Sequence, residues 1–257
     1  MSSKFKLAER IVYASRASRI AKASRLGIIV SAVLTFLIFA ISYYGETVGN
    51  FTFSVDRLAY NAGISMYEDE TENPDYTTRL VSVRVDNADG MTALCGTEYS
   101  QFPVGTDLCI PSDEFAGSVD GANNLPSVLI YTFYIENSGD APVDLESNLV
   151  VQSATKGAEE AIRVRVIIDG VGTTYAKRQS SRGAIPGSLE PLTHQFYDLT
   201  TVMHDQYAYF DIDQVMKITV MVWYEGEDAD HNLNIVGGGV KLDMKFTITR
   251  IYGEDDY

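Results

Sequence analysis

The chain is poor in the residues and motifs that most enzymes and metal proteins require. It has two cysteines and three histidines in 257 residues. No CxxC pair, GxSxG turn or P-loop occurs, and none of the histidines, His194, His204 and His231, begins an HExxH helix. These absences argue against structural zinc sites, zinc proteases, GxSxG hydrolases and P-loop nucleotide binding. A Ser-His-Asp triad assembled by the fold stays open, but no local motif nominates one. We therefore expect a protein that is not an enzyme.

Charge is absent from residues 26–44, "LGIIVSAVLTFLIFAISYY". A helix of this length spans roughly 28 Å at about 1.5 Å per residue, which matches the hydrocarbon thickness of a bilayer. Arg25 fits the inner edge, and Tyr43 and Tyr44 fit the opposite interface. We predict a single transmembrane helix acting as an uncleaved signal anchor. The alternative is a cleavable signal peptide, although "AISYYGETVG" matches a small-x-small cleavage site poorly.

Basic residues gather before this span and acidic residues after it. Residues 1–25 hold seven of the 20 basic and one of the 35 acidic side chains, which leaves 13 basic and 34 acidic residues beyond, a net charge of −21. The bias predicts that residues 1–25 are cytoplasmic and that residues 45–257 lie outside the cell. Apolar residues spaced three and four apart in the basic segment favour a helix at the inner membrane surface. The acidic remainder argues against nucleic-acid binding.

The two cysteines, Cys95 and Cys109, both fall in the part predicted to be extracellular. An isolated pair in an oxidising compartment is most simply a disulfide that closes a surface loop. Two free thiols are the alternative.

Beyond residue 45 the hydrophobic pattern has a period of two, which is typical of strands, and no convincing helix of twelve residues appears. We predict an all-β fold, an antiparallel jelly roll or β-sandwich. The expected strands cover residues 50–56, 79–87, 128–137, 143–153, 162–169, 216–225 and 240–252. Two turn-rich stretches, at about 86–126 and 170–215, are expected to be long insertions on this core, where loops often carry function.

Two clusters in the sequence are candidate binding sites. The first is an aromatic group, Phe196, Tyr197, Tyr207 and Tyr209, which could stack on a sugar or a partner protein; packing in the core is the competing interpretation. The second is an acidic group, Glu225, Glu227, Asp228 and Asp230, in "WYEGEDADHNLNIVGGG". An EF-hand is excluded because Leu233 and Gly239 stand where glycine and glutamate are required. A looser calcium site stays open beside a plain acidic connection between two strands.

Two stretches resemble a known group of surface proteins. "YTFYIENSGDAPVDLESNLVV" (131–151) is similar to part of the domain of the TasA/camelysin group of Gram-positive surface proteins. "KITVMVWYEGEDADHNLNIVGGGVKLDMKFTI" (217–248) resembles the last hairpin of many membrane-anchored Firmicutes ectodomains of uncharacterised role. The resemblance implies a jelly-roll domain outside the cell, with a role in surface structure or the biofilm matrix. The protease label of camelysin does not carry over, because no matching zinc motif exists here.

These observations predict a membrane-anchored structural or interaction protein, with other surface subunits or further copies of itself as partners. In the group that it resembles, subunits polymerise by donating an N-terminal strand to a neighbour. The matching segment here is "NFTFSVD", whose Phe51, Phe53 and Val55 lie on one face of a strand that pairs either in its own sheet or in a neighbour's. Retention of the membrane helix departs from that group, whose fibre subunits are released by signal peptidase. The alternative function is a carbohydrate or cell-wall-binding module, supported by calcium.

Overall fold

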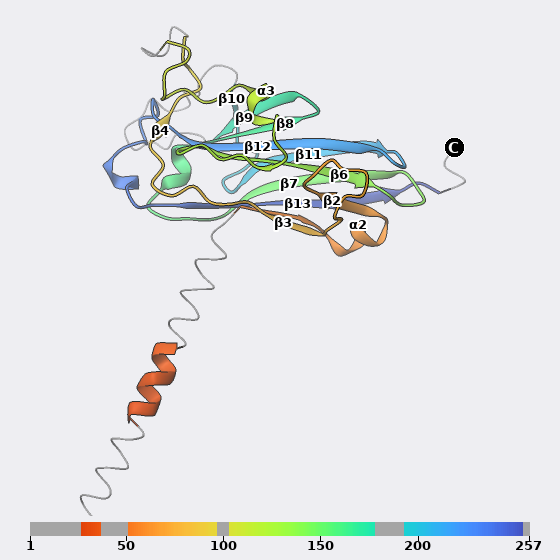
Figure 1. Cartoon of the computed structure of the whole chain (residues 1–257), viewed down its shortest axis with the longest axis horizontal. Helices are drawn as coiled ribbons and strands as arrows, with labels where there is room; N and C mark the ends of the chain where they lie inside the picture. Colours follow the sequence, from red (N-terminus) through yellow and green to blue (C-terminus); the bar gives the residue numbers. More distant parts are fainter. Residues whose placement is uncertain (1–26, 37–50, 97–102, 178–192, 254–257) are drawn as a thin grey trace, which may run out of the picture. The chain divides into compact units, whose positions relative to one another are not determined.

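The computed structural model describes residues 27–36, 51–96, 103–177 and 193–253. The chain divides into two units, residues 1–49 and 50–257. In the first unit, residues 27–36 form an α-helix (Figure 1). The remainder of the predicted span, Leu26 and residues 37–44, lies outside the described residues, as does the basic segment 1–25. Within the described ranges, no helix is both long enough and apolar enough to cross a bilayer.

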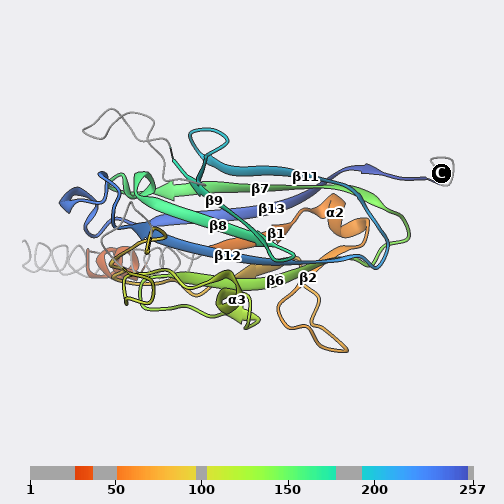
Figure 2. The same ribbon diagram turned by 90° about the horizontal axis from the view of Figure 1, so that it is seen from above.

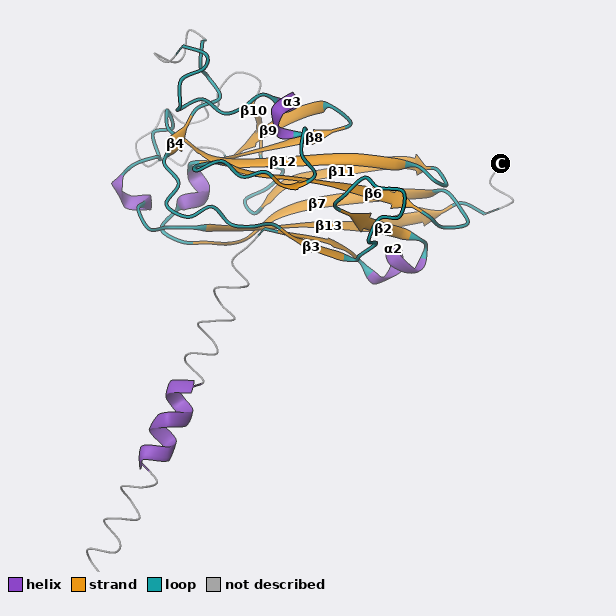
Figure 3. Ribbon diagram, viewed as in Figure 1, coloured by secondary structure: helices purple, strands orange, loops and turns teal. Residues whose placement is uncertain are grey.

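The second unit consists mainly of strands, as predicted (Figure 3). The strands of the described residues form two sheets, one of five strands in the order β11-β7-β13-β1-β3 and one of eight. The larger sheet has the order β10-β9-β8-β12-β6-β2, with β4 added beside β12 and β5 beside β6. The strands are β1 (Thr52–Val55), β2 (Ile64–Tyr67), β3 (Arg79–Val81), β4 (Gly90–Met91), β5 (Gly121–Ala122), β6 (Leu129–Asn137), β7 (Val143–Ala154), β8 (Ile162–Ile168), β9 (Val171–Ala176), β10 (Thr193–Gln195), β11 (Thr201–Phe210), β12 (Val215–Glu225) and β13 (Val240–Ile251).

Short helical turns complete the unit: α2 (Arg57–Asn61), α3 (Asp113–Ala116), η1 (Ala158–Glu160) and η2 (Leu233–Ile235). Each α-helical turn begins at a polar cap. The Asp56 carboxylate accepts from the Ala59 backbone amide at 2.7 Å, and the Ser112 hydroxyl accepts from the Phe115 amide at 3.3 Å. Such caps satisfy amides that have no partner in the first turn of a helix.

The two sheets pack face to face around one hydrophobic core (Figure 2). The pattern of strand β7 explains why one of its faces packs against the core. Residues 143–150 alternate buried and half-buried positions, as a strand with one core face requires. Leu145 and Leu149 come from this strand, and Phe133, Ile218 and Val164 face them from the larger sheet.

A second, smaller hydrophobic cluster covers the other face of the larger sheet. Its main members are Met91, Ala116, Ile130, Met221 and Trp223. They come from the central strands β6 and β12 and from the segment 86–126, which contributes β4, α3 and β5. Strands β6 and β12 are therefore buried on both faces, and the segment predicted to be an insertion serves as a cover for the sheet.

Two of the fold predictions need correction. The sheets are mixed, not purely antiparallel, because β1 pairs in parallel with β13, β10 with β9, and β4 with β12. Residues 170–215 are not only an insertion, since they supply β9, β10 and the ten-residue β11 to the two sheets. Register irregularities at both ends of β11 break its period-two pattern, which hid the strand from sequence reasoning.

Candidate functional site

The first strand, β1, lies inside its own sheet. It runs parallel to β13, with Phe53 opposite Met244, and antiparallel to β3. Phe51, Phe53 and Val55 are all buried in the main core. These are the three residues that the sequence nominates for strand donation, and in the single chain they complete the chain's own core.

Phe53 is the anchor of this strand. Its ring stacks on Tyr131 with 4.9 Å between the centroids and contacts Phe133 at 4.5 Å. The Thr52 hydroxyl donates to the Asp243 carboxylate on β13. On the other side β1 is covered by β3, which has only three residues. The strand therefore fills a slot between a long partner and a short one.

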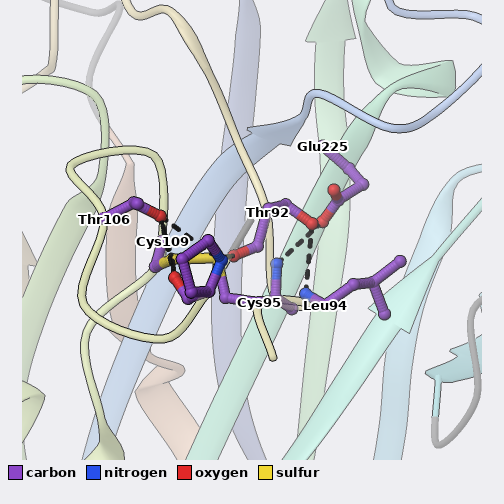
Figure 4. The surroundings of a disulfide bond; sticks show 8 residues. Thr92, Leu94, Cys95, Thr106, Cys109 and Glu225 are labelled. Atoms are coloured by element: carbon purple, nitrogen blue, oxygen red, sulfur yellow. Dashed lines mark hydrogen bonds between the residues drawn. A yellow bond between two sulfur atoms is a disulfide. The ribbon is translucent and has the colours of Figure 1, made fainter. Parts of the chain in front are cut away.

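Two of the four residues of the acidic cluster, Glu225 and Asp228, are buried and not solvated. Glu225 is fully buried, and its Oε2 accepts hydrogen bonds from Trp223 Nε1 at 3.1 Å and from the Ala93 amide at 3.2 Å. Its Oε1 accepts from the Glu227 amide at 3.3 Å. The bond from Ala93 ties the end of β12 to the chain that leads to Cys95 (Figure 4).

Asp228 is also buried, against an arginine that the sequence analysis missed. Arg163 Nη2 donates to Asp228 Oδ2 at 2.6 Å, and both side chains are almost fully enclosed. The other oxygen of Asp228 accepts from the Asp230 amide at 2.8 Å. Arg163 lies opposite Trp223 in the β8–β12 register, so both belong to the covered outer face of the larger sheet.

The four acids do not form a calcium site. Glu227 is exposed, whereas Glu225 and Asp228 already bind protein donors. Burial, with the nearby charges of Asp228 and Glu160, raises the pKa of Asp230. In the described parts of the chain, no group of three or more acidic, histidine or cysteine side chains is placed to hold a metal ion.

Cys95 and Cys109 lie at disulfide distance, as predicted, with 1.98 Å between the sulfurs and 5.9 Å between the Cα atoms. Thr106 Oγ1 lies 2.9 Å from Cys109 Sγ (Figure 4). Thr92 and Cys109 also form an isolated parallel bridge, so the bond joins two segments that already lie side by side.

The aromatic cluster is divided between the core and separate surface positions. Phe196 is buried, with 3% of its surface exposed, and cannot contribute to a binding surface. The half-buried Tyr207 packs on the core, its hydroxyl 3.3 Å from Ser147 Oγ, and burial raises its pKa to about 12. Tyr197 is 68% exposed and contacts His204, whereas Tyr209 contacts Tyr252. The four residues therefore do not form one stacking platform.

No protein-family model matches the chain, and no curated protein sequence matches it significantly.

Proposed function

We propose that the chain is a non-enzymatic, membrane-anchored extracellular protein whose jelly-roll-like sandwich acts through protein–protein contact. Residues 26–44 would hold it in the cell membrane with the N-terminus in the cytoplasm. Further copies of the chain or related surface subunits would be its partners, joined by strand addition into a filament or matrix.

The arrangement of β1 supports this proposal most directly. The strand is the first element of residues 50–257, and its core side chains all project from one short segment. It is held by a parallel pairing to β13 on one side and by the short β3 on the other. In strand exchange, such a strand leaves the slot in its own copy and enters the equivalent slot of another copy. It makes the same contacts there.

Engineered disulfides test the exchange. Ser54 lies opposite Lys245 in the parallel β1–β13 register, so the pair Ser54→Cys and Lys245→Cys reports which copy supplies β1. The control pair is Asn148→Cys with Lys245→Cys, because Asn148 lies opposite Lys245 on β7, inside the body of the sandwich.

Oxidation at high protein concentration is followed by non-reducing gel electrophoresis. The β1 pair is expected to give covalent dimers and higher oligomers, whereas the control pair stays within one chain. Only intrachain bonds in both variants, under conditions in which the chain assembles, would rule out exchange of β1.

A further inference from the structure

A cluster of tyrosines and carboxylates lies on the outer face of the larger sheet, at the β2 edge. Tyr67 on β2 lies opposite Tyr134 on β6, and the two rings stack with 5.1 Å between their centroids. Tyr76 meets Tyr67 edge to face at 5.6 Å. We call this group the tyrosine–carboxylate cluster; its members are Tyr67, Tyr76, Tyr134, Glu70, Asp120 and Glu136.

Three carboxylates lie beside tyrosine hydroxyls at the cluster. The Tyr134 hydroxyl donates its single proton to Asp120 Oδ1 at 2.8 Å, and Glu70 Oε2 lies 3.3 Å from the same hydroxyl oxygen. The Tyr76 hydroxyl donates to Glu136 Oε2 at 3.1 Å. The cluster thus combines three negative charges with aromatic rings, and Tyr76 presents its ring to solvent with 52% of its surface exposed.

A further polar group of β2 belongs to the same face and is unsatisfied among the described residues. Ser65 lies opposite Glu136, and its enclosed Oγ has no hydrogen-bond partner in that part of the chain. Buried polar groups are normally paired, so this hydroxyl indicates a site that is completed from outside. Beside it, burial and the charges of Glu136 and its neighbours raise the pKa of Tyr67 to about 12, so the Tyr67 hydroxyl lies within the field of the carboxylates.

The cluster already receives one ammonium group from its own chain. Lys217 Nζ lies 3.7 Å from Asp120 Oδ1 and 5.3 Å from the centre of the Tyr134 ring. This is the geometry of a cation–π contact combined with an ion pair. Lys217 supplies one positive charge against three carboxylates. The cluster therefore keeps an excess of negative charge, which a second cation would partly neutralise.

We propose that the tyrosine–carboxylate cluster binds lysine side chains of a basic peptide segment in a partner protein. An ammonium group has three donors and no acceptor, which suits carboxylate oxygens and a tyrosine hydroxyl that accepts. The aromatic faces favour an organic cation. A metal ion is disfavoured, because no group of described acidic residues is placed to hold one. The site is separate from β1 and does not depend on strand exchange.

The test measures binding of a capped peptide of alternating glycine and lysine to the full-length chain at about physiological salt, where long-range attraction is screened. The comparison peptide carries Nε-acetyllysine at every lysine and is expected not to bind. Tyr76→Leu removes an aromatic ring without changing charge and should weaken binding about two- to fivefold, the range for an exposed cation–π contact. Glu136→Gln should also weaken binding, and Glu114→Gln, an exposed acid on α3, serves as its control.

Lys217→Gln is the most informative variant, because it removes the chain's own ammonium group, which competes with the peptide lysines for the cluster. Binding should tighten more than in Lys245→Gln, which makes the same charge change on the other sheet. Circular dichroism confirms that each variant is folded. Equal effects of Lys217→Gln and Lys245→Gln, or unchanged affinity in Tyr76→Leu, would overturn the proposal and leave net charge as the cause of binding. Equal binding of the acetylated peptide would also overturn it, because the ammonium groups would then have no part in recognition.

Discussion

At the scale of single residues, the Arg163–Asp228 pair shows what a buried ion pair does in this fold. The two side chains are enclosed, and their 2.6 Å contact joins β8 to the loop after β12. Removing one partner leaves the other charge buried without compensation. We expect Asp228→Ala to lower the free energy of unfolding by about 3–5 kcal/mol, measured by urea denaturation.

The exposed pair Arg84–Asp86 is the matched control, with a 2.9 Å contact and both side chains largely in solvent. Asp86→Ala should change the free energy of unfolding by less than about 1 kcal/mol, since exposed pairs contribute little. Similar losses in the two variants would contradict the structural role of Asp228. Replacing Arg163 and Asp228 together by apolar residues should recover part of the loss, because no charge is then left buried.

Asp198 provides a pH-dependent prediction. The backbone amides of Thr200 and Thr201 donate to its carboxylate at 2.8 and 2.6 Å, and these bonds lower its pKa to about 2. A lowered pKa in the folded state means that the ionised carboxylate stabilises the turn above its unfolded pKa of about 4 and that this contribution disappears as the pH falls through about 2.

Asp198→Asn should therefore be less stable than the natural chain at pH 5 and nearly equal to it below pH 2. Thermal unfolding of both proteins across this range measures the difference. A difference that stays constant with pH would show that the charge of Asp198 has no part in it.

At the scale of elements, the turn before β2 packs backbone to backbone against the turn after β6. A Cβ atom added at Gly139 would lie 2.0 Å from the Ala62 carbonyl oxygen, and one at Gly63 would lie 2.2 Å from the Gly139 Cα. Because the obstacle is backbone, it cannot move aside as a flexible side chain would. Gly139→Ala should cost about 1–3 kcal/mol of stability, as overpacking does in well-packed interiors.

Gly239 is the control for this substitution. A Cβ at Gly239 meets nothing within 4 Å, so Gly239→Ala should be neutral or stabilise by up to about 1 kcal/mol through the unfolded chain. Chemical denaturation of both variants decides the comparison. Equal tolerance at the two positions would mean that the two turns do not make this close contact.

The elements also show which parts of the fold the sequence could predict. Strands β6, β7, β8, β12 and β13 fall within a residue or two of their expected bounds, because each alternates or carries a long apolar run. Strands β2, β4, β5, β9 and β10 were missed because most are short and lie beside turns. Their positions depend on which longer strand they pair with, and the local pattern does not encode that choice.

The candidate site was predicted less well, for a related reason. The sequence predicted an acidic connection between two strands that includes Glu225 and Asp228, but nothing in it predicted that these two carboxylates are buried. The burial of Asp228 depends on Arg163, which lies 65 residues before it and follows an ordinary strand pattern, whereas that of Glu225 depends on donors from Trp223 and Ala93. The segment 86–126 covers the outer face of the larger sheet, on which Arg163 lies. No local pattern in "IRVRVII" predicts that this face is covered.

At the scale of the whole molecule, β1 connects the fold with the proposed function. The same side chains that complete the core would complete a neighbour's core after exchange. The free energy that holds β1 in its slot would therefore limit both the stability of one copy and the proposed assembly of many. Phe53 concentrates that free energy, since its ring is fully buried against Tyr131 and Phe133.

Phe53→Ala in the full-length chain should lower the free energy of unfolding by about 3–5 kcal/mol, the cost of removing a buried phenylalanine ring. A synthetic peptide of residues 50–56 that retains Phe53 should then raise the melting temperature of this variant with increasing concentration, because it displaces the weakened β1 and binds the folded state in its slot. A peptide with the same composition in scrambled order is the control. If both peptides leave the melting temperature unchanged, the slot does not accept a strand from outside, and exchange of β1 between copies loses its physical basis.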